Sequence, residues 1–206
     1  MAETVSGRLI LDDGEVLGRL LVDDYGRIAG IEPDAAAPTH TLVVPGFIDV
    51  HVHGWGGHDA MGGPAALSGM ARALAGRGVT SFLPTSVTAS FEQLTDFAEA
   101  VRGWIPEAPA DGAEPLGFNM EGPFLAEAKK GAHPAGLLRH PEDLDDERLA
   151  TFVEGLRVIT IAPELRGAPD LIARLAARGV RVSLGHSAAT VAEARAGYAA
   201  GAVTTT

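Results

Sequence analysis

The spacing of hydrophobic residues along the chain changes near residue 41. Before this point, residues 4–32 carry short apolar runs separated by Asp-Gly and Tyr-Gly pairs. Short runs bounded by turn-forming residues are typical of strands joined by tight turns. Residues 1–43 are therefore predicted to form part of a small β domain, with a loop over 34–40. Its sheet is too short to close a core of its own.

From residue 41 onward, apolar runs alternate with longer segments of helical period. The runs that predict strands cover 41–54, 79–87, 115–124, 158–164, 180–187 and 202–206. The segments that predict helices cover 65–78, 91–104, 143–155, 169–179 and 190–201. Two helix starts, Ser90 with Gln93 and Thr190 with Glu193, have the spacing of capping boxes. Five strand–helix units and a sixth strand indicate an α/β protein with a parallel sheet, open or closed.

The first of these strands ends in the sequence GFIDVHVHG. Side chains two apart in a strand point the same way, so Asp49, His51 and His53 share one face. Two imidazoles placed there can bind one cation, and neutral imidazole suits Zn, Fe, Ni or Cu. A half-exposed strand with unrelated histidines has the same short pattern, so this motif alone leaves both interpretations open.

Two further strands end in residues that can bind metal. Glu121 lies in NMEGPF at the end of the third strand, and His186 lies in LGHS at the end of the fifth. A carboxylate at an apolar strand end is costly unless it is paired or bound to metal. Taken singly, Glu121 could equally be a solvated loop residue rather than a metal ligand. A single histidine such as His186 is more often structural than a ligand. Three strands delivering such side chains to the same predicted face favour a metal site.

Composition and charge narrow the classes of function. The chain has 206 residues, a formal net charge of -11 and a pI of about 5.0, so we expect no general affinity for nucleic acid or anionic membranes. It has no cysteine, which excludes disulfides and thiolate nucleophiles and fits a reducing compartment. The first residues lack the features of a signal peptide, and no apolar run approaches the roughly 18 residues of a membrane helix. A cytoplasmic location is expected.

The chain carries several motifs that together resemble the N-acetylglucosamine-6-phosphate deacetylase family of the amidohydrolase superfamily. In order, they are PGFIDVHVHG, NMEGPF, KKGAHPAG, IAPE and GHSAAT. The resemblance implies a (β/α)8 barrel of the TIM type, incomplete over residues 44–206, and a small β-sandwich to which residues 1–43 contribute. It also implies an amide hydrolase that removes acetate from N-acetylglucosamine 6-phosphate and leaves glucosamine 6-phosphate.

The resemblance assigns four metal ligands. Glu121 and His186 match the ligands of the family's main metal ion. His51 and His53 match a pair that holds a second ion in some members, whereas other members lack the pair. The implied cofactor is one or two divalent ions of Zn, Fe, Mn or Co, because His and Glu ligands separate these metals poorly.

The same resemblance indicates how the substrate is held and which groups lie further along the family's chains. Ala132 and His133 match a loop that contacts the sugar, the alanine through its backbone. The family's sixth strand carries one more metal-binding histidine and its eighth strand a catalytic aspartate, and both positions fall beyond Thr206. We therefore expect no catalytic base within these residues and an inactive N-terminal fragment of a longer protein. The full-length protein is expected to be a homodimer.

Two other hypotheses stay open at this point. The chain is compatible with another amidohydrolase, such as a dihydroorotase or an amino-acid deacylase. Many enzymes of that type bridge their metals through a modified lysine, whereas the third strand here ends in Glu121. The chain is also compatible with a catalytically incomplete fragment that at most binds metal weakly.

Overall fold

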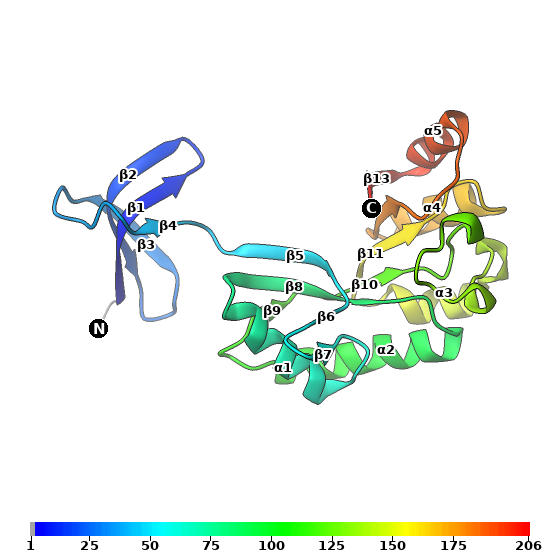
Figure 1. The fold of residues 1–206 in the computed structure, drawn as a ribbon, viewed down its shortest axis with the longest axis horizontal. Coiled ribbons are helices and arrows are strands. Elements are labelled where there is room, and N and C mark those ends of the chain that lie inside the picture. Colours follow the sequence, from blue (N-terminus) through cyan, green and yellow to red (C-terminus); the bar gives the residue numbers. More distant parts are fainter. Residues whose placement is uncertain (1–2) are drawn as a thin grey trace. The chain divides into compact units, whose positions relative to one another are not determined.

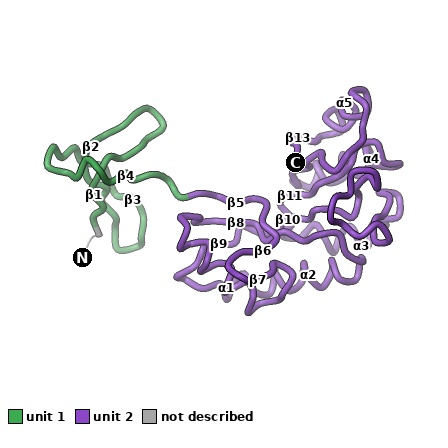
Figure 2. Tube along the Cα trace, in the orientation of Figure 1, with its two compact units in different colours: residues 1–46 green, residues 47–206 purple. Residues whose placement is uncertain are grey.

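The computed structural model of the protein describes residues 3–206 and consists of two compact units, residues 1–46 and 47–206 (Figure 2). The first unit is a four-stranded sheet with the order β3-β2-β1-β4. Its strands are β1 (Glu3–Leu11), β2 (Gly14–Val22), β3 (Ile28–Pro33) and β4 (Leu42–Val43). β2 pairs antiparallel with both β1 and β3, whereas β4 runs parallel to β1.

The first unit buries little apolar surface. Leu9 and Ala37 are its buried hydrophobic residues within the range 4–46, whereas Ile28 and Leu42 are exposed. A sheet of this kind has no substantial core of its own, as the sequence predicted. Its place in a larger β-sandwich stays a prediction.

The apolar segment over 41–54, predicted as one strand region, is divided in the structure. The strand β4 ends at Val43 in the first unit, and β5 (Phe47–Val52) belongs to the sheet of the second. Pro45 has no backbone N–H to donate to a sheet and separates the two strands. Beyond β5, β6 (Gly54–Trp55) and β7 (His58–Asp59) pair in a small hairpin that the sequence did not predict.

The second unit is built on a parallel sheet with the strand order β5-β8-β10-β11-β12-β13 (Figure 1). After β5, its strands are β8 (Val79–Ser86), β10 (Phe118–Glu121), β11 (Leu156–Ile161), β12 (Arg181–Leu184) and β13 (Ala202–Thr205). The short β9 (Glu114–Pro115) pairs with β8. Neighbouring strands follow one another in the chain and run parallel. This order confirms the predicted partial (β/α) barrel.

Helices connect the consecutive strands of this sheet (Figure 1). They are α1 (Pro64–Ala75), α2 (Phe91–Trp104), α3 (Asp146–Val153), α4 (Ala168–Ala176) and α5 (Val191–Ala200). Single 3-10 turns occupy Ile105–Glu107, Glu127–Lys129, Ala135–Leu137 and Pro141–Asp143. Within residues 3–206, no helix combines the length and the apolar character needed to cross a bilayer.

The predicted capping boxes are present at the starts of α2 and α5. Ser90 Oγ accepts the N–H of Gln93, whose side-chain oxygen accepts the N–H of Ser90 in return. Thr190 and Glu193 form the same reciprocal pair. Each pair satisfies backbone donors of the first helical turn, and an N-cap of this kind contributes about 1 kcal/mol.

A hydrophobic core packs the sheet against the helices. Phe118 of β10 is fully buried and meets Phe97 of α2 edge to face, with ring centroids 5.6 Å apart. Phe82 of β8 packs in the same way against Trp104 of α2, at 6.3 Å. Because β8 and β10 are anchored by these large side chains, the residues at their carboxyl ends have a rigid support.

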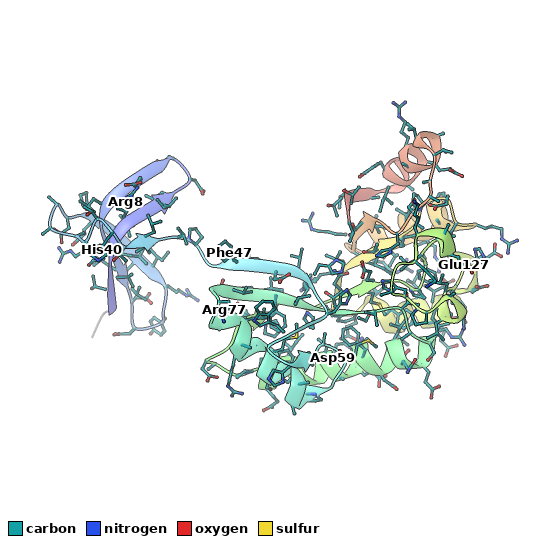
Figure 3. All side chains as sticks on the ribbon, in the orientation of Figure 1. Arg8, His40, Phe47, Asp59, Arg77 and Glu127 are labelled. Atoms are coloured by element: carbon teal, nitrogen blue, oxygen red, sulfur yellow. The ribbon has the colours of Figure 1, made fainter. Side chains whose placement is uncertain are left out.

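Removal of the Phe118 ring should therefore destabilise the second unit. Phe118→Ala is expected to lower the free energy of unfolding by about 3–5 kcal/mol, because it leaves a cavity in the core. Phe47→Ala is the matched control, since Phe47, labelled in Figure 3, is 65% exposed at the start of β5. Urea denaturation followed by circular dichroism measures both. Equal losses for the two variants would contradict this description of the core.

Candidate metal centre

Five side chains that can bind a metal or donate a proton meet at the carboxyl ends of the parallel strands. Glu121 is the last residue of β10, and His51 and His53 lie at the end of β5. His186 follows β12 by two residues, and His133 lies in the loop between β10 and α3. The carboxyl ends of parallel strands share one edge of a sheet, which is why residues far apart in sequence converge there.

The carboxylate of Glu121 is the point on which the four imidazoles converge. Its oxygen Oε2 lies 2.9 Å from Nε2 of His53 and 3.2 Å from Nε2 of His133. Its oxygen Oε1 lies 3.0 Å from Nε2 of His186 and 3.4 Å from Nε2 of His51. Glu121 is only 5% exposed, so water does little to solvate its charge. Side-chain nitrogens and carboxylate oxygens in this arrangement form two overlapping groups that could each hold an ion.

The protonation state of Glu121 follows from these neighbours. Burial raises the pKa of its carboxyl, but hydrogen bonds with His51 and His53 and the electrostatic attraction of His51 and His186 outweigh burial. They hold the pKa of Glu121 far below its usual value. Glu121 is therefore ionised at neutral pH and supplies a fixed negative charge to the centre.

The backbone orients two of the imidazoles in a way that suits metal binding. Nδ1 of His53 lies 3.1 Å from the carbonyl oxygen of Thr85, and Nδ1 of His186 lies 2.8 Å from that of Lys129. A carbonyl oxygen only accepts, so in each ring the proton must be on Nδ1. In the neutral ring, Nε2 then turns a lone pair toward the centre. Metal-binding histidines are commonly held by a hydrogen bond of this kind.

His133 has the opposite arrangement. Its Nδ1 accepts the backbone N–H of Thr88 at 3.1 Å, so the proton of the neutral ring is on Nε2 and points at Glu121. Burial lowers the pKa of His133, against the opposing effect of Glu121, and this keeps the ring neutral. His133 is therefore a hydrogen-bond donor at the centre, although its nitrogen lies close enough to be counted among possible metal ligands.

The donor set fits a divalent cation. The Nε2 atoms of His51 and His53 are 3.2 Å apart, and those of His53 and His186 face carboxylate oxygens at 2.9 and 3.0 Å. Lone pairs at such distances repel unless a positive charge lies among them, as protons on the rings or as a metal ion. Imidazole nitrogens with one carboxylate suit Zn and related transition metals.

The sequence predicted part of this arrangement. His51, His53, Glu121 and His186 were expected on one face, and the structure brings them together. Asp49 lies beside them and its Oδ1 accepts the backbone N–H of His51, at 3.0 Å.

His133 was expected only to contact substrate, and its approach to Glu121 was not anticipated. Ala132 is exposed next to it, and its contact with a sugar stays a prediction. The supporting groups Thr85, Thr88 and Lys129 were missed, because they act through backbone atoms that leave no residue-type signal.

Comparisons with known proteins identify the family. The model of the amidohydrolase family matches residues 42–206. N-acetylgalactosamine-6-phosphate deacetylase of Escherichia coli O157:H7 is 38% identical over 200 residues, which are 95% of this chain and 53% of that protein. N-acetylglucosamine-6-phosphate deacetylase of Homo sapiens is 36% identical over 203 residues, 89% of this chain and 47% of that protein. The chain thus spans about half the length of the curated relatives it matches.

Solved structures of related enzymes resemble nearly the whole of this chain and about half of their own length. N-acetylglucosamine-6-phosphate deacetylase from Thermotoga maritima has a TM-score of 0.86 and 31% identity, covering 97% of this chain and 53% of that one. A mutant of the enzyme from Mycobacterium smegmatis, in complex with N-acetyl-D-glucosamine-6-phosphate, has a TM-score of 0.81 and 26% identity. That match covers 99% of this chain and 55% of the Mycobacterium smegmatis chain.

Zinc binding to the 206-residue chain tests the ligand set. His53→Ala and Glu121→Gln should each weaken Zn²⁺ affinity roughly 10-fold or more, since even the outer partners of metal ligands cost about 10- to 100-fold. Competition with a chromophoric chelator measures the affinity. His140→Ala is the matched control, because His140 is exposed in the part of the chain between β10 and α3. Equal affinities of the three variants and the parent chain would refute the assignment.

Proposed function

Because the chain belongs to the amidohydrolase family, we propose that the full-length protein is a metal-dependent deacetylase of N-acetylglucosamine 6-phosphate. Hydrolysis of the acetamide would give acetate and glucosamine 6-phosphate, as in amino-sugar catabolism and recycling. The convergence of imidazoles on the buried carboxylate of Glu121 carries the proposal of metal-assisted hydrolysis. The substrate class rests on the relatives, most of which are named as deacetylases of this sugar phosphate.

We assign His51, His53, Glu121 and His186 as the residues that would hold one or two divalent ions. When bound, such an ion polarises a carbonyl group and lowers the pKa of a coordinated water toward about 7. His and carboxylate ligands accept Zn, Fe, Mn or Co, so the donor set leaves the metal open among these.

The chain's own residues contribute orientation and one proton donor. His53 and His186 are fixed by backbone carbonyls with their Nε2 atoms toward the centre. His133 directs its Nε2–H to the same place and can donate to the oxygen on which negative charge develops during attack on the amide. Because burial keeps His133 neutral, this donor is present without an ionised ring. The backbone of Ala132, one residue earlier, is proposed to contact the sugar.

A second substrate is favoured by one comparison. The relative from Escherichia coli O157:H7 is named as the deacetylase of N-acetylgalactosamine 6-phosphate. The two sugars differ only in the orientation of one ring hydroxyl, and the centre around Glu121 acts on the acetamide that both share. We therefore treat the galactosamine compound as the alternative substrate of the same reaction.

We also propose that the full-length protein is a cytoplasmic homodimer that binds a small phosphosugar and neither nucleic acid nor membrane. The net charge of -11 supports the lack of affinity for nucleic acid and anionic membranes, and the absence of cysteine fits a reducing compartment such as the cytoplasm. The dimer rests on the family resemblance alone. Light scattering after gel filtration tests the dimer, and a monomer at micromolar concentration would contradict it.

The reaction itself gives the next prediction. The metal-loaded full-length protein should release acetate from N-acetylglucosamine 6-phosphate, faster than from N-acetylgalactosamine 6-phosphate and from unphosphorylated N-acetylglucosamine. A coupled acetate assay measures the three rates, and treatment with a chelator should abolish all of them. Faster turnover of the galactosamine compound would select the alternative substrate, and no turnover of either phosphate would refute the deacetylase.

The role of His133 gives a separate prediction. His133→Ala should lower kcat by about 10²–10³, the usual effect of removing one donor to a developing oxyanion. His133→Gln keeps an N–H donor and should restore part of the loss. Metal content, measured by atomic absorption, should stay at the parent level in both variants. Loss of the metal together with the activity would show that His133 is a ligand instead.

A further inference from the structure

The backbone at His186 is unusual. His186 has φ of 48°, and it is the one non-glycine residue with positive φ that the described part of the chain contains. This left-handed conformation is unfavourable for a residue with a Cβ atom, so the surrounding structure must impose it. His186 lies just beyond β12, and its backbone conformation sets the direction of its side chain. The conformation therefore also determines where the imidazole points.

Glu164 binds the turn that follows His186. It lies after the end of β11, and its Oε2 accepts the hydroxyl of Ser187 at 2.7 Å while its Oε1 accepts the backbone N–H of Ala188. Ser187 Oγ in turn accepts the N–H of Ala189 at 2.9 Å. One carboxylate therefore takes two donors from consecutive residues, and bonds to an ionised acceptor are stronger than neutral ones.

The other side of His186 is held by the loop after β10. Its carbonyl oxygen accepts the N–H of Ala126 at 2.9 Å, and its Nδ1 donates to the carbonyl of Lys129 at 2.8 Å. Both of these contacts act on His186 itself. Glu164 supplies the complementary restraint on the residues that follow, from a different loop of the barrel.

We propose that Glu164 is a positioning residue, which holds the turn Ser187–Ala189 and so directs the imidazole of His186 at Glu121. The inference rests on the proposed function, because it deepens the role assigned to His186 as a metal ligand. Glu164 itself does not contact the centre. Its contacts with Ser187 and Ala188 account for the presence of a carboxylate, since an apolar side chain there would leave both donors without this acceptor.

Two substitutions at Glu164 test whether its hydrogen bonds to Ser187 and Ala188 matter, or only the size of its side chain. Glu164→Ala removes both acceptors. Glu164→Gln keeps an oxygen for the N–H of Ala188, and its amide can donate to Ser187 Oγ, so both contacts survive in a weaker, neutral form. Glu127→Ala is the matched control, because Glu127 is exposed on the neighbouring loop labelled in Figure 3 and carries the same charge.

The test is Zn²⁺ affinity of the 206-residue chain, measured by chelator competition. Glu164→Ala should weaken binding about 10- to 100-fold, the range found for residues that orient metal ligands. Glu164→Gln should recover most of this loss, and Glu127→Ala should bind as the parent chain does. Far-ultraviolet circular dichroism on the same samples checks that each variant is folded.

A double-mutant cycle with His186→Ala identifies the route of the effect. Once the imidazole is absent, adding Glu164→Ala should cause no further loss of Zn²⁺ affinity. An equal loss in both backgrounds would show a general structural role and overturn the proposal.

If His186→Ala weakens binding but Glu164→Ala does not, the positioning role is wrong while the metal centre stands. If His186→Ala itself has no effect on affinity, the metal centre is wrong and the positioning role is refuted with it.

Discussion

The shared carboxylate of Glu121 is the interaction on which the candidate centre depends. It is 5% exposed and ionised, so its charge must be compensated by groups that the fold brings to it. The compensation comes from imidazoles at two strand ends, those of β5 and β12, and in one loop. None of these segments could supply it alone, which links the chemistry of the centre to the assembly of the parallel sheet beneath it.

The backbone decides what each imidazole can do. A carbonyl oxygen next to Nδ1, as at His53 and His186, leaves a lone pair on Nε2 of the neutral ring, as metal binding requires. An amide N–H behind Nδ1, as at His133, leaves a proton there and makes a donor. Histidines around one carboxylate thus differ in which ring nitrogen bears the proton. The main-chain atoms of Thr85, Thr88 and Lys129 determine this difference.

Much of the fold could be predicted because its units are local. The alternation of apolar runs and helical segments sets the order of elements, and the capping pair Ser90–Gln93 determines where α2 begins. The division of the segment 41–54 was missed, because the apolar pattern continues across Pro45 although the ladder does not. The hairpin β6–β7 was missed because glycine-rich sequence carries little periodic signal.

Only those residues of the candidate site that lie at strand ends could be predicted from the sequence. His51, His53, Glu121 and His186 occupy such positions, so the topology of a parallel sheet is enough to place them together. His133 lies in a long loop whose course depends on tertiary contacts, and neither its approach to Glu121 nor its proton could be inferred from spacing. Glu164 contacts the turn beyond His186 from another loop, and the pattern of hydrophobic residues in the sequence does not indicate this contact.

The most direct test of this account is to observe the histidine protons in the zinc-loaded, ¹⁵N-labelled chain by NMR. The account predicts Nδ1–H and metal-bound Nε2 for His53 and His186, and Nε2–H without metal for His133. A metal-bound Nε2 on His133, or imidazole signals at these positions that zinc leaves unchanged, would contradict it.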